Sequence, residues 1–85
     1  MNTMETLKIA HQKFSEACFR KMKRKERAGW FGWDDPNEEW TLKLKLKEHF
    51  RREWTQKNLV DIANFCMFLW NLKKEEMGTL NSDDD

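Results

Sequence analysis

The chain has 85 residues, of which 39% are hydrophobic and 36% charged, and sixteen Lys and Arg against fifteen Asp and Glu leave a net charge of +1. This length predicts one small domain, and five Trp and six Phe with only three Gly and one Pro exclude a disordered or collagen-like chain. A domain of this size buries only about 60–65% of its unfolded surface. Part of the aromatic surface is therefore either exposed or covered by a second chain.

Residues 4–27 have the spacing of an amphipathic helix. Asn2 or Thr3 can cap its start, and Gly29 follows its end. Six Lys and Arg with one Glu fill residues 20–27, where cations suit the negative end of the helix dipole. The apolar positions are Leu7, Ala10, Phe14, Ala17, Cys18 and Met22.

A second helix is predicted from about residue 36 to about residue 54. Asp35 can cap it, Pro36 suits its first position, and Glu38 completes a capping box. Leu and Lys alternate over residues 42–47, which alone would suggest a strand. The four-residue spacing and the capping box favour a helix, with apolar positions at Leu42, Leu46, Phe50 and Trp54.

A third helix is predicted to begin at Thr55 or Asn58 and to run to about Glu76, before Gly78. Eleven of the fourteen residues 59–72 are apolar. This run is too short to cross a membrane and is typical of a buried core helix. Together the three segments predict an all-α fold, a three-helix unit whose bundle is completed by homodimerisation.

The domain boundaries and the compartment follow from the same patterns. Residues 1–80 are expected to form a single helical domain, and residues 81–85 a disordered acidic tail. Charged and apolar positions interleave over the first twenty residues, unlike a secretory signal. Cys18 and Cys66 lack metal-ligand spacing, which predicts reduced core thiols in a cytoplasmic protein.

The aromatic residues divide into two groups. Those on helical faces are expected to share a core: Phe14, Phe50, Trp54, Phe65, Phe68 and Trp70. The others gather around one turn: Trp30, Phe31, Trp33 and Trp40. Gly32 permits a tight turn there. The turn is either a plug that closes the bundle or a dimer seam or partner contact.

Polar residues on the third helix predict the functional site. Asp61, Asn64 and Asn71 lie on one stripe of an otherwise apolar segment. An ionised carboxylate there is costly unless it is paired or bound to a metal. Asp61 therefore either meets a basic side chain of the second helix, near Arg51 and Arg52, or faces water at a helix end, or binds a metal.

The segment Val-Asp-Ile-Ala-Asn-Phe-Cys-Met-Phe at residues 60–68 resembles the Asp-Val-Ala-Asn-Phe-Ala-Met-Met stretch of phage-type MazG-like proteins. These belong to the all-α NTP pyrophosphatase superfamily. A Gly-Trp turn at Gly29 and a Leu-rich helix containing Glu48 fit the same pattern, over roughly residues 10–73. The resemblance implies homodimers or higher assemblies in which carboxylates of two neighbouring helices hold Mg²⁺ against a nucleoside triphosphate.

Carried over residue by residue, the resemblance assigns Glu48 and Asp61 as metal ligands and catalytic carboxylates. Asn58 stands where the family has a Glu, three residues before Asp61, and basic residues neighbour Glu48. We therefore expect a nucleotide-binding protein whose Mg²⁺-dependent pyrophosphohydrolase activity is weak or lost. The expected ligand contacts are Arg51, Arg52 and Asn64, with the arginines meeting phosphate directly.

A second hypothesis is a small phage-type interaction or inhibitor protein. Its basic, Trp-rich surface would bind a macromolecular partner, either a protein or a single-stranded nucleic acid. The cations are those of residues 20–27 with Lys43, Lys45, Lys47, Arg51 and Arg52. A solvated helix face is the commoner reason for such runs, and the net charge of +1 weighs against nucleic acid. His11 and His49 are expected to be ordinary helix-surface residues.

Overall fold

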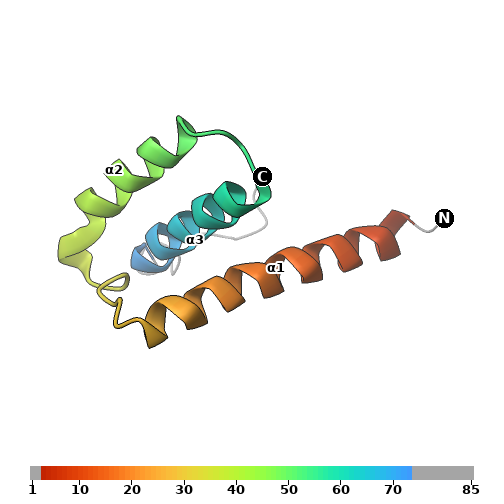
Figure 1. Cartoon of the computed structure of the whole chain (residues 1–85), viewed down its shortest axis with the longest axis horizontal. Coiled ribbons are helices and arrows are strands. Elements are labelled where there is room, and N and C mark those ends of the chain that lie inside the picture. The colour runs from red at the N-terminus through yellow and green to blue at the C-terminus, as the bar shows by residue number, and fades with distance from the viewer. Residues whose placement is uncertain (1–2, 74–85) are drawn as a thin grey trace.

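The computed structural model describes residues 3–73, and all of the regular structure in this range is helical (Figure 1). Its elements are α1 (Thr3–Arg27), a short 3-10 helix η1 (Pro36–Glu38), α2 (Glu39–Phe50) and α3 (Gln56–Leu72). The all-α prediction is confirmed. The expectations for Asn2, for the helix end near Glu76 and Gly78, and for the acidic tail lie outside the described residues.

Asp35 and Thr55 act as caps as predicted, but Asp35 caps η1, and Glu38, the N-cap of α2, makes no side-chain cap bond. Asp35 precedes η1, and its Oδ1 accepts a hydrogen bond from the Asn37 backbone N–H at 2.9 Å. Thr55, rather than Asn58, caps α3, because its Oγ1 accepts the Asn58 N–H at 3.1 Å. Gly29 has φ 85° and Gly32 has φ 100°, which side-chain-bearing residues rarely adopt.

The second helix ends earlier than the prediction of about residue 54. α2 stops at Phe50, and Trp54 lies in the connection to α3. The last carbonyls of α2 find other donors, because the His49 oxygen accepts the Arg52 N–H at 3.2 Å and the Asn58 side chain at 2.8 Å. This tertiary bond satisfies the helix end.

α2 and α3 run antiparallel, and the core lies along their contact (Figure 1). Leu42, Ile62 and Phe68 are its buried apolar side chains. Trp30 and Trp33 pack on Phe68, with ring centroids 5.7 and 5.5 Å away. These two rings close the core as a plug.

Two other rings of the aromatic turn remain outside the core. Phe31 is 83% exposed and Trp40 is 68% exposed. Two of the four rings are therefore packed as the plug prediction expects, and two are exposed. Contact of the exposed rings with a partner or a second chain stays a prediction.

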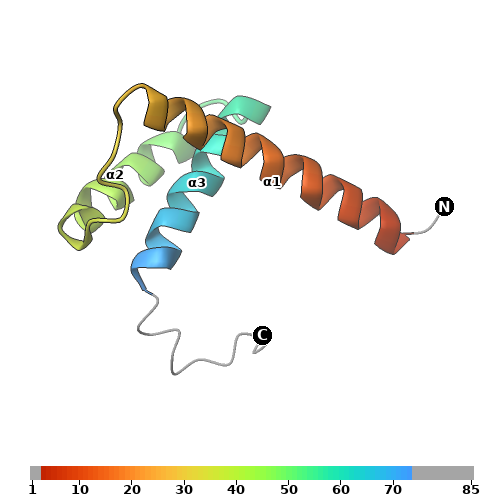
Figure 2. The same ribbon diagram turned by 90° about the horizontal axis from the view of Figure 1, so that it is seen from below.

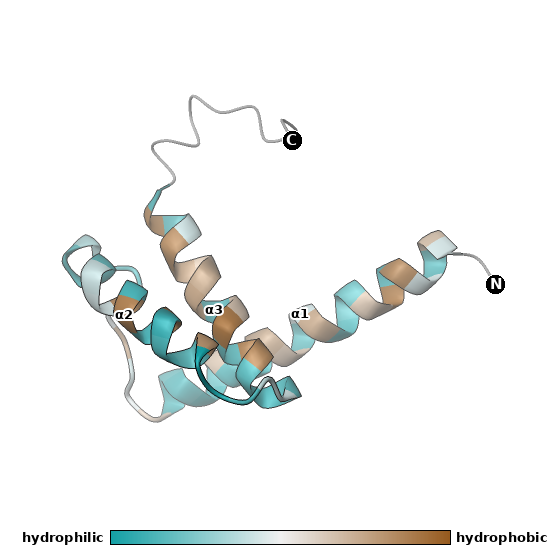
Figure 3. Cartoon of the chain, turned by 90° about the horizontal axis from the view of Figure 1, so that it is seen from above, coloured by the Kyte–Doolittle hydropathy of each residue, from teal (hydrophilic) through white to brown (hydrophobic). Residues whose placement is uncertain are grey.

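α1 packs on α3 only through its second half. Its first half, residues 3–16, is exposed throughout and projects away from the other helices (Figure 2). A helix of 25 residues is about 37 Å long, and the 17-residue α3 is about 25 Å long. Hydrophobic bands remain on the projecting half (Figure 3), including Leu7 and Phe14.

The prediction of one shared aromatic core was therefore wrong for four of its six rings. Phe65 and Phe68 are packed, whereas Phe14, Phe50, Trp54 and Trp70 are all exposed. The short α2–α3 hairpin has too little surface to cover them. Homodimerisation stays a prediction, since one chain is described.

The cysteines differ in their surroundings. Both thiols are free, but Cys66 is exposed, so the prediction of two core thiols was wrong for this residue. Cys18 is half-buried where α1 meets α3, and burial raises the pKa of its thiol. Across residues 3–73, none of the helices combines the length and apolarity needed to span a membrane.

Candidate functional site

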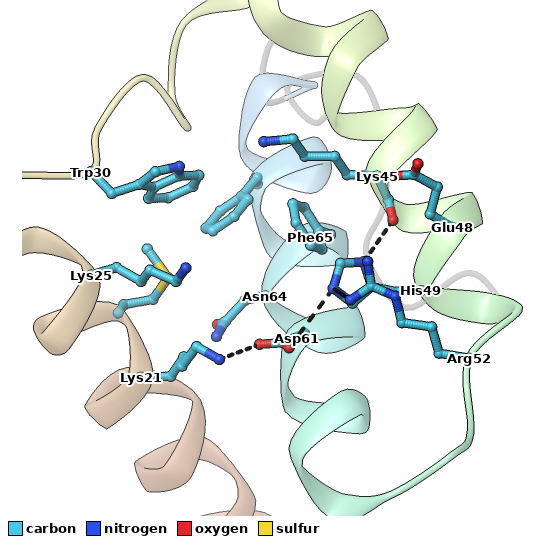
Figure 4. Close-up of a pocket in the computed structure, with 12 residues that line it drawn as sticks. Lys21, Lys25, Trp30, Lys45, Glu48, His49, Arg52, Asp61, Asn64 and Phe65 are labelled. Atoms are coloured by element: carbon cyan, nitrogen blue, oxygen red, sulfur yellow. Dashed lines mark hydrogen bonds and ion pairs between the residues drawn. The ribbon is translucent and has the colours of Figure 1, made fainter. Parts of the chain in front are cut away.

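A pocket of about 330 Å³ opens where the three helices meet (Figure 4). The last turns of α1 contribute Lys21 and Lys25, and α2 contributes Lys45, Glu48 and His49. Arg52 comes from the turn after α2, and α3 contributes Asp61, Asn64, Phe65 and Phe68. The pocket is completed by Met22 and by Trp30 of the aromatic turn. Its lining therefore combines aromatic rings with ionisable groups.

Asp61 lies between two helices and bonds to a cation. Its Oδ1 is 2.8 Å from Lys21 Nζ, with the two side chains only 19% and 17% exposed. Its Oδ2 is 3.8 Å from His49 Nε2. The basic partner was expected from the second helix, but it comes from α1, whose last turns cross α3 at this level (Figure 4).

His49 is buried, so its prediction as a surface residue was wrong. Its Nδ1 lies 2.7 Å from the Lys45 carbonyl oxygen. Because a carbonyl only accepts, Nδ1 carries the proton. The other nitrogen, Nε2, lies 3.2 Å from Arg52 Nη1, and in this tautomer it accepts a hydrogen bond from that guanidinium. Its spacing of seven residues from Leu42 is the signal that would have placed it on the core face.

Two buried asparagines flank Asp61 on α3. Asn58 Nδ2 donates to the His49 carbonyl at 2.8 Å, and Asn64 Nδ2 donates to the Cys18 carbonyl at 3.2 Å. The stripe of residues 58, 61 and 64 thus binds α3 to both other helices. Asn64, a predicted ligand contact, lines the pocket, but its side-chain N–H is used in the hydrogen bond to the Cys18 carbonyl.

The acidic residues do not form a set that suits a metal ion. Glu48 and Asp61 both line the pocket, but their side chains lie on either side of His49 (Figure 4). Among residues 3–73, no three His, Cys, Asp or Glu side chains are grouped to hold a cation. Mg²⁺ binds through several oxygen ligands in octahedral geometry. These donors do not fit it, because Lys21 already occupies one Asp61 oxygen.

The charge of the pocket favours an anion. Four cations line it, Lys21, Lys25, Lys45 and Arg52, against the carboxylates of Glu48 and Asp61. The Lys21–Asp61 pair is internally neutral, so the others set the local potential. Arg51, the other predicted phosphate contact, is exposed and outside the pocket lining.

One wall of the pocket is aromatic. The Trp30, Phe65 and Phe68 rings line it, and Lys25 Nζ lies 6.0 Å from the Trp30 ring centroid. Flat apolar surface beside several donors suits a ligand that has both a planar ring and a negatively charged group. Comparisons with protein-family models, curated proteins and solved structures gave no match to this chain.

Proposed function

We propose that the chain binds a nucleotide in this pocket without a metal ion, and that Mg²⁺-dependent pyrophosphate hydrolysis is weak or lost. The observation that carries the proposal is the 2.8 Å contact of Lys21 Nζ with Asp61 Oδ1. An ammonium group there supplies the positive charge that a metal ion would supply, and it repels a divalent cation. The carboxylate is left with a structural role.

Three basic groups of the pocket would meet the phosphates. Lys25 and Lys45 bring ammonium groups, and Arg52 brings a guanidinium whose one hydrogen bond within residues 3–73 is to His49. A guanidinium has five donors and bonds phosphate in a bidentate way. Because His49 holds it, Arg52 is oriented before a ligand arrives, which lowers the entropy cost of binding.

The nucleobase would stack on the aromatic wall beside Trp30 and Phe65. Stacking on an aromatic ring tolerates every base, so this arrangement predicts weak base preference. A volume of about 330 Å³ lies at the lower end of the range of small-molecule pockets. The resemblance of residues 60–68 to MazG-like proteins supports a nucleoside phosphate as the ligand class.

Calorimetric titration of the chain with nucleoside mono-, di- and triphosphates tests the proposal. We expect binding in EDTA that Mg²⁺ does not strengthen, and affinity that rises with the number of phosphates. Charge-assisted hydrogen bonds contribute about 1.5–3 kcal/mol, so Arg52→Gln should weaken binding at least about tenfold. Arg51→Gln is the matched control, since Arg51 has the same charge next in the chain but lies outside the pocket lining.

Two results would contradict the proposal. Mg²⁺-dependent pyrophosphate release that disappears in Asp61→Ala would show an active metal site. Equal losses of affinity in the Arg51 and Arg52 variants would mean that nonspecific charge, rather than this pocket, binds the nucleotide.

A further inference from the structure

A second row of cations continues from the pocket along α1. Lys21, Arg24, Lys25 and Lys57 line a hollow of about 240 Å³ between α1 and the start of α3. An adjoining hollow of about 170 Å³ shares Lys21, Arg24 and Lys57 and adds Arg20. These five residues, here named the basic groove, meet the pocket at Lys21 and Lys25.

The basic groove contains no acidic lining residue. Lys21 alone among its five cations has a carboxylate partner within residues 3–73. The acidic residues near the start of α2 lie elsewhere, and there Glu39 bonds to Lys43 at 2.9 Å. A positively charged surface therefore lies beside the pocket, although the net charge of the chain is close to zero.

Helix stability does not explain this arrangement. Cations near the end of α1 suit its dipole, but that end carries only about half an elementary charge. Arg20 and Arg24, and Lys21 and Lys25, are like-charged pairs four residues apart, which disfavour a helix. Lys57 adds a further positive charge from the first turn of α3, where the dipole favours an anion. An external polyanion would relieve all of these repulsions.

We propose that the basic groove carries the sugar–phosphate backbone of a single-stranded nucleic acid, one nucleotide of which occupies the pocket. This inference rests on the proposed nucleotide binding and extends it. The aromatic wall at Trp30 takes an unpaired base, since a base inside a duplex is already stacked. Lys25 lies at the junction and faces both the ring and the groove.

Fluorescence anisotropy with labelled oligonucleotides tests the inference, using eight-residue oligo-dT and oligo-U and a duplex of the same length. We expect the single strands to bind at least tenfold more tightly than the matching mononucleotide. Each phosphate contact contributes about 0.7 to the slope of log K against log salt for single strands. The four unpaired groove cations, together with Lys45 and Arg52 of the pocket, therefore predict a slope of about −4.

The double variant Arg24→Gln/Lys57→Gln separates the groove from the pocket, because neither residue lines the pocket. We expect oligonucleotide affinity to fall about tenfold and the salt slope to shrink by about 1.4, with mononucleotide affinity unchanged within twofold. Lys8→Gln/Lys13→Gln is the control, since it removes two exposed cations from the far half of α1. Circular dichroism checks that both variants stay helical.

The outcomes distinguish the two proposals. Oligonucleotides that bind no more tightly than mononucleotides would overturn the groove and leave nucleotide binding intact. Absence of binding by either ligand would overturn both. A duplex that binds more tightly than the single strands, or equal losses in the two double variants, would overturn the assignment of a single strand to the groove. The relative affinities of oligo-dT and oligo-U report which sugar the groove prefers.

Discussion

Replacing Lys21 with Met tests the ion pair on which the site depends. The substitution keeps the length and the apolar stem of the side chain but removes the ammonium group. Within residues 3–73, the ionisable neighbour left to Asp61 would be His49, whose Nε2 lies 3.8 Å from Oδ2. Because the carboxylate is mostly buried, its loss of a partner leaves a poorly solvated charge.

The magnitude follows from distance and burial. Two unit charges 2.8 Å apart attract by about 6 kcal/mol at an effective dielectric constant of about 20, and desolvation offsets most of this. Exposed pairs contribute about 0.2–1 kcal/mol, and breaking a fully buried pair costs about 3–5 kcal/mol. The Lys21–Asp61 pair lies between these limits, so we expect about 2 kcal/mol. In a domain of this size, that lowers Tm by about 8–16 °C.

Urea and thermal unfolding, followed by circular dichroism, measure this loss. Lys21→Met, Asp61→Asn and the double variant complete a cycle whose coupling energy we expect to be about 1–2 kcal/mol. Lys13→Met is the matched control, an exposed lysine on the projecting half of α1. If Lys21→Met destabilises the chain no more than Lys13→Met does, the pair does not stabilise the site and the reasoning fails.

Three further predictions concern the rest of the chain. Asn58→Ala should cost about 1–3 kcal/mol in unfolding free energy by removing a buried bond to the end of α2, whereas the exposed Asn37→Ala should cost under about 0.5 kcal/mol; urea titration compares them. The exposed Cys66 should react with a thiol reagent faster than Cys18. Because burial raises the pKa of the Cys18 thiol, the stability that the protonated thiol supplies is present below the unfolded pKa of about 8.5 and is lost as pH rises above it. Unfolding measured at pH 7 and pH 10, with Cys18→Ala as the control, detects this loss. If a second copy covers the projecting half of α1, light scattering should show a dimer for the wild-type chain and a monomer for Phe14→Glu. A wild-type chain that is monomeric at all concentrations would contradict this prediction.

Local signals account for most of the helix boundaries. Asp35, followed by Pro36, and Thr55 accept their cap bonds from backbone N–H groups within three residues. Such short-range bonds can be predicted from the local sequence alone. The end of α2 was missed for the opposite reason. Leu42 to Trp54 keep their helical spacing, but the bond from Asn58 to the His49 carbonyl spans nine residues and is decided by the fold of the hairpin.

The site divides in the same way. Asp61 could be singled out because a carboxylate on an apolar helix needs a partner. The partner of Asp61 could not be predicted from the sequence, since residues 20–27 offer six equivalent cations. The crossing of α1 over α3 selects Lys21 among them. Arg51 and Arg52 were likewise indistinguishable in sequence, and the turn after α2 places only Arg52 in the pocket lining.

Net charge is the property that says least about local arrangement. A net charge of +1 argues against a nucleic-acid ligand when it is treated as an average over the surface. Acidic residues such as Glu38 and Glu39 lie in η1 and at the start of α2, whereas the lining of the basic groove, from the second half of α1 and Lys57, contains cations and no acidic residue. The Debye length is about 8 Å at physiological ionic strength. A phosphate in the basic groove therefore senses the nearby cations rather than the chain average, so local arrangement decides which ligand the surface attracts.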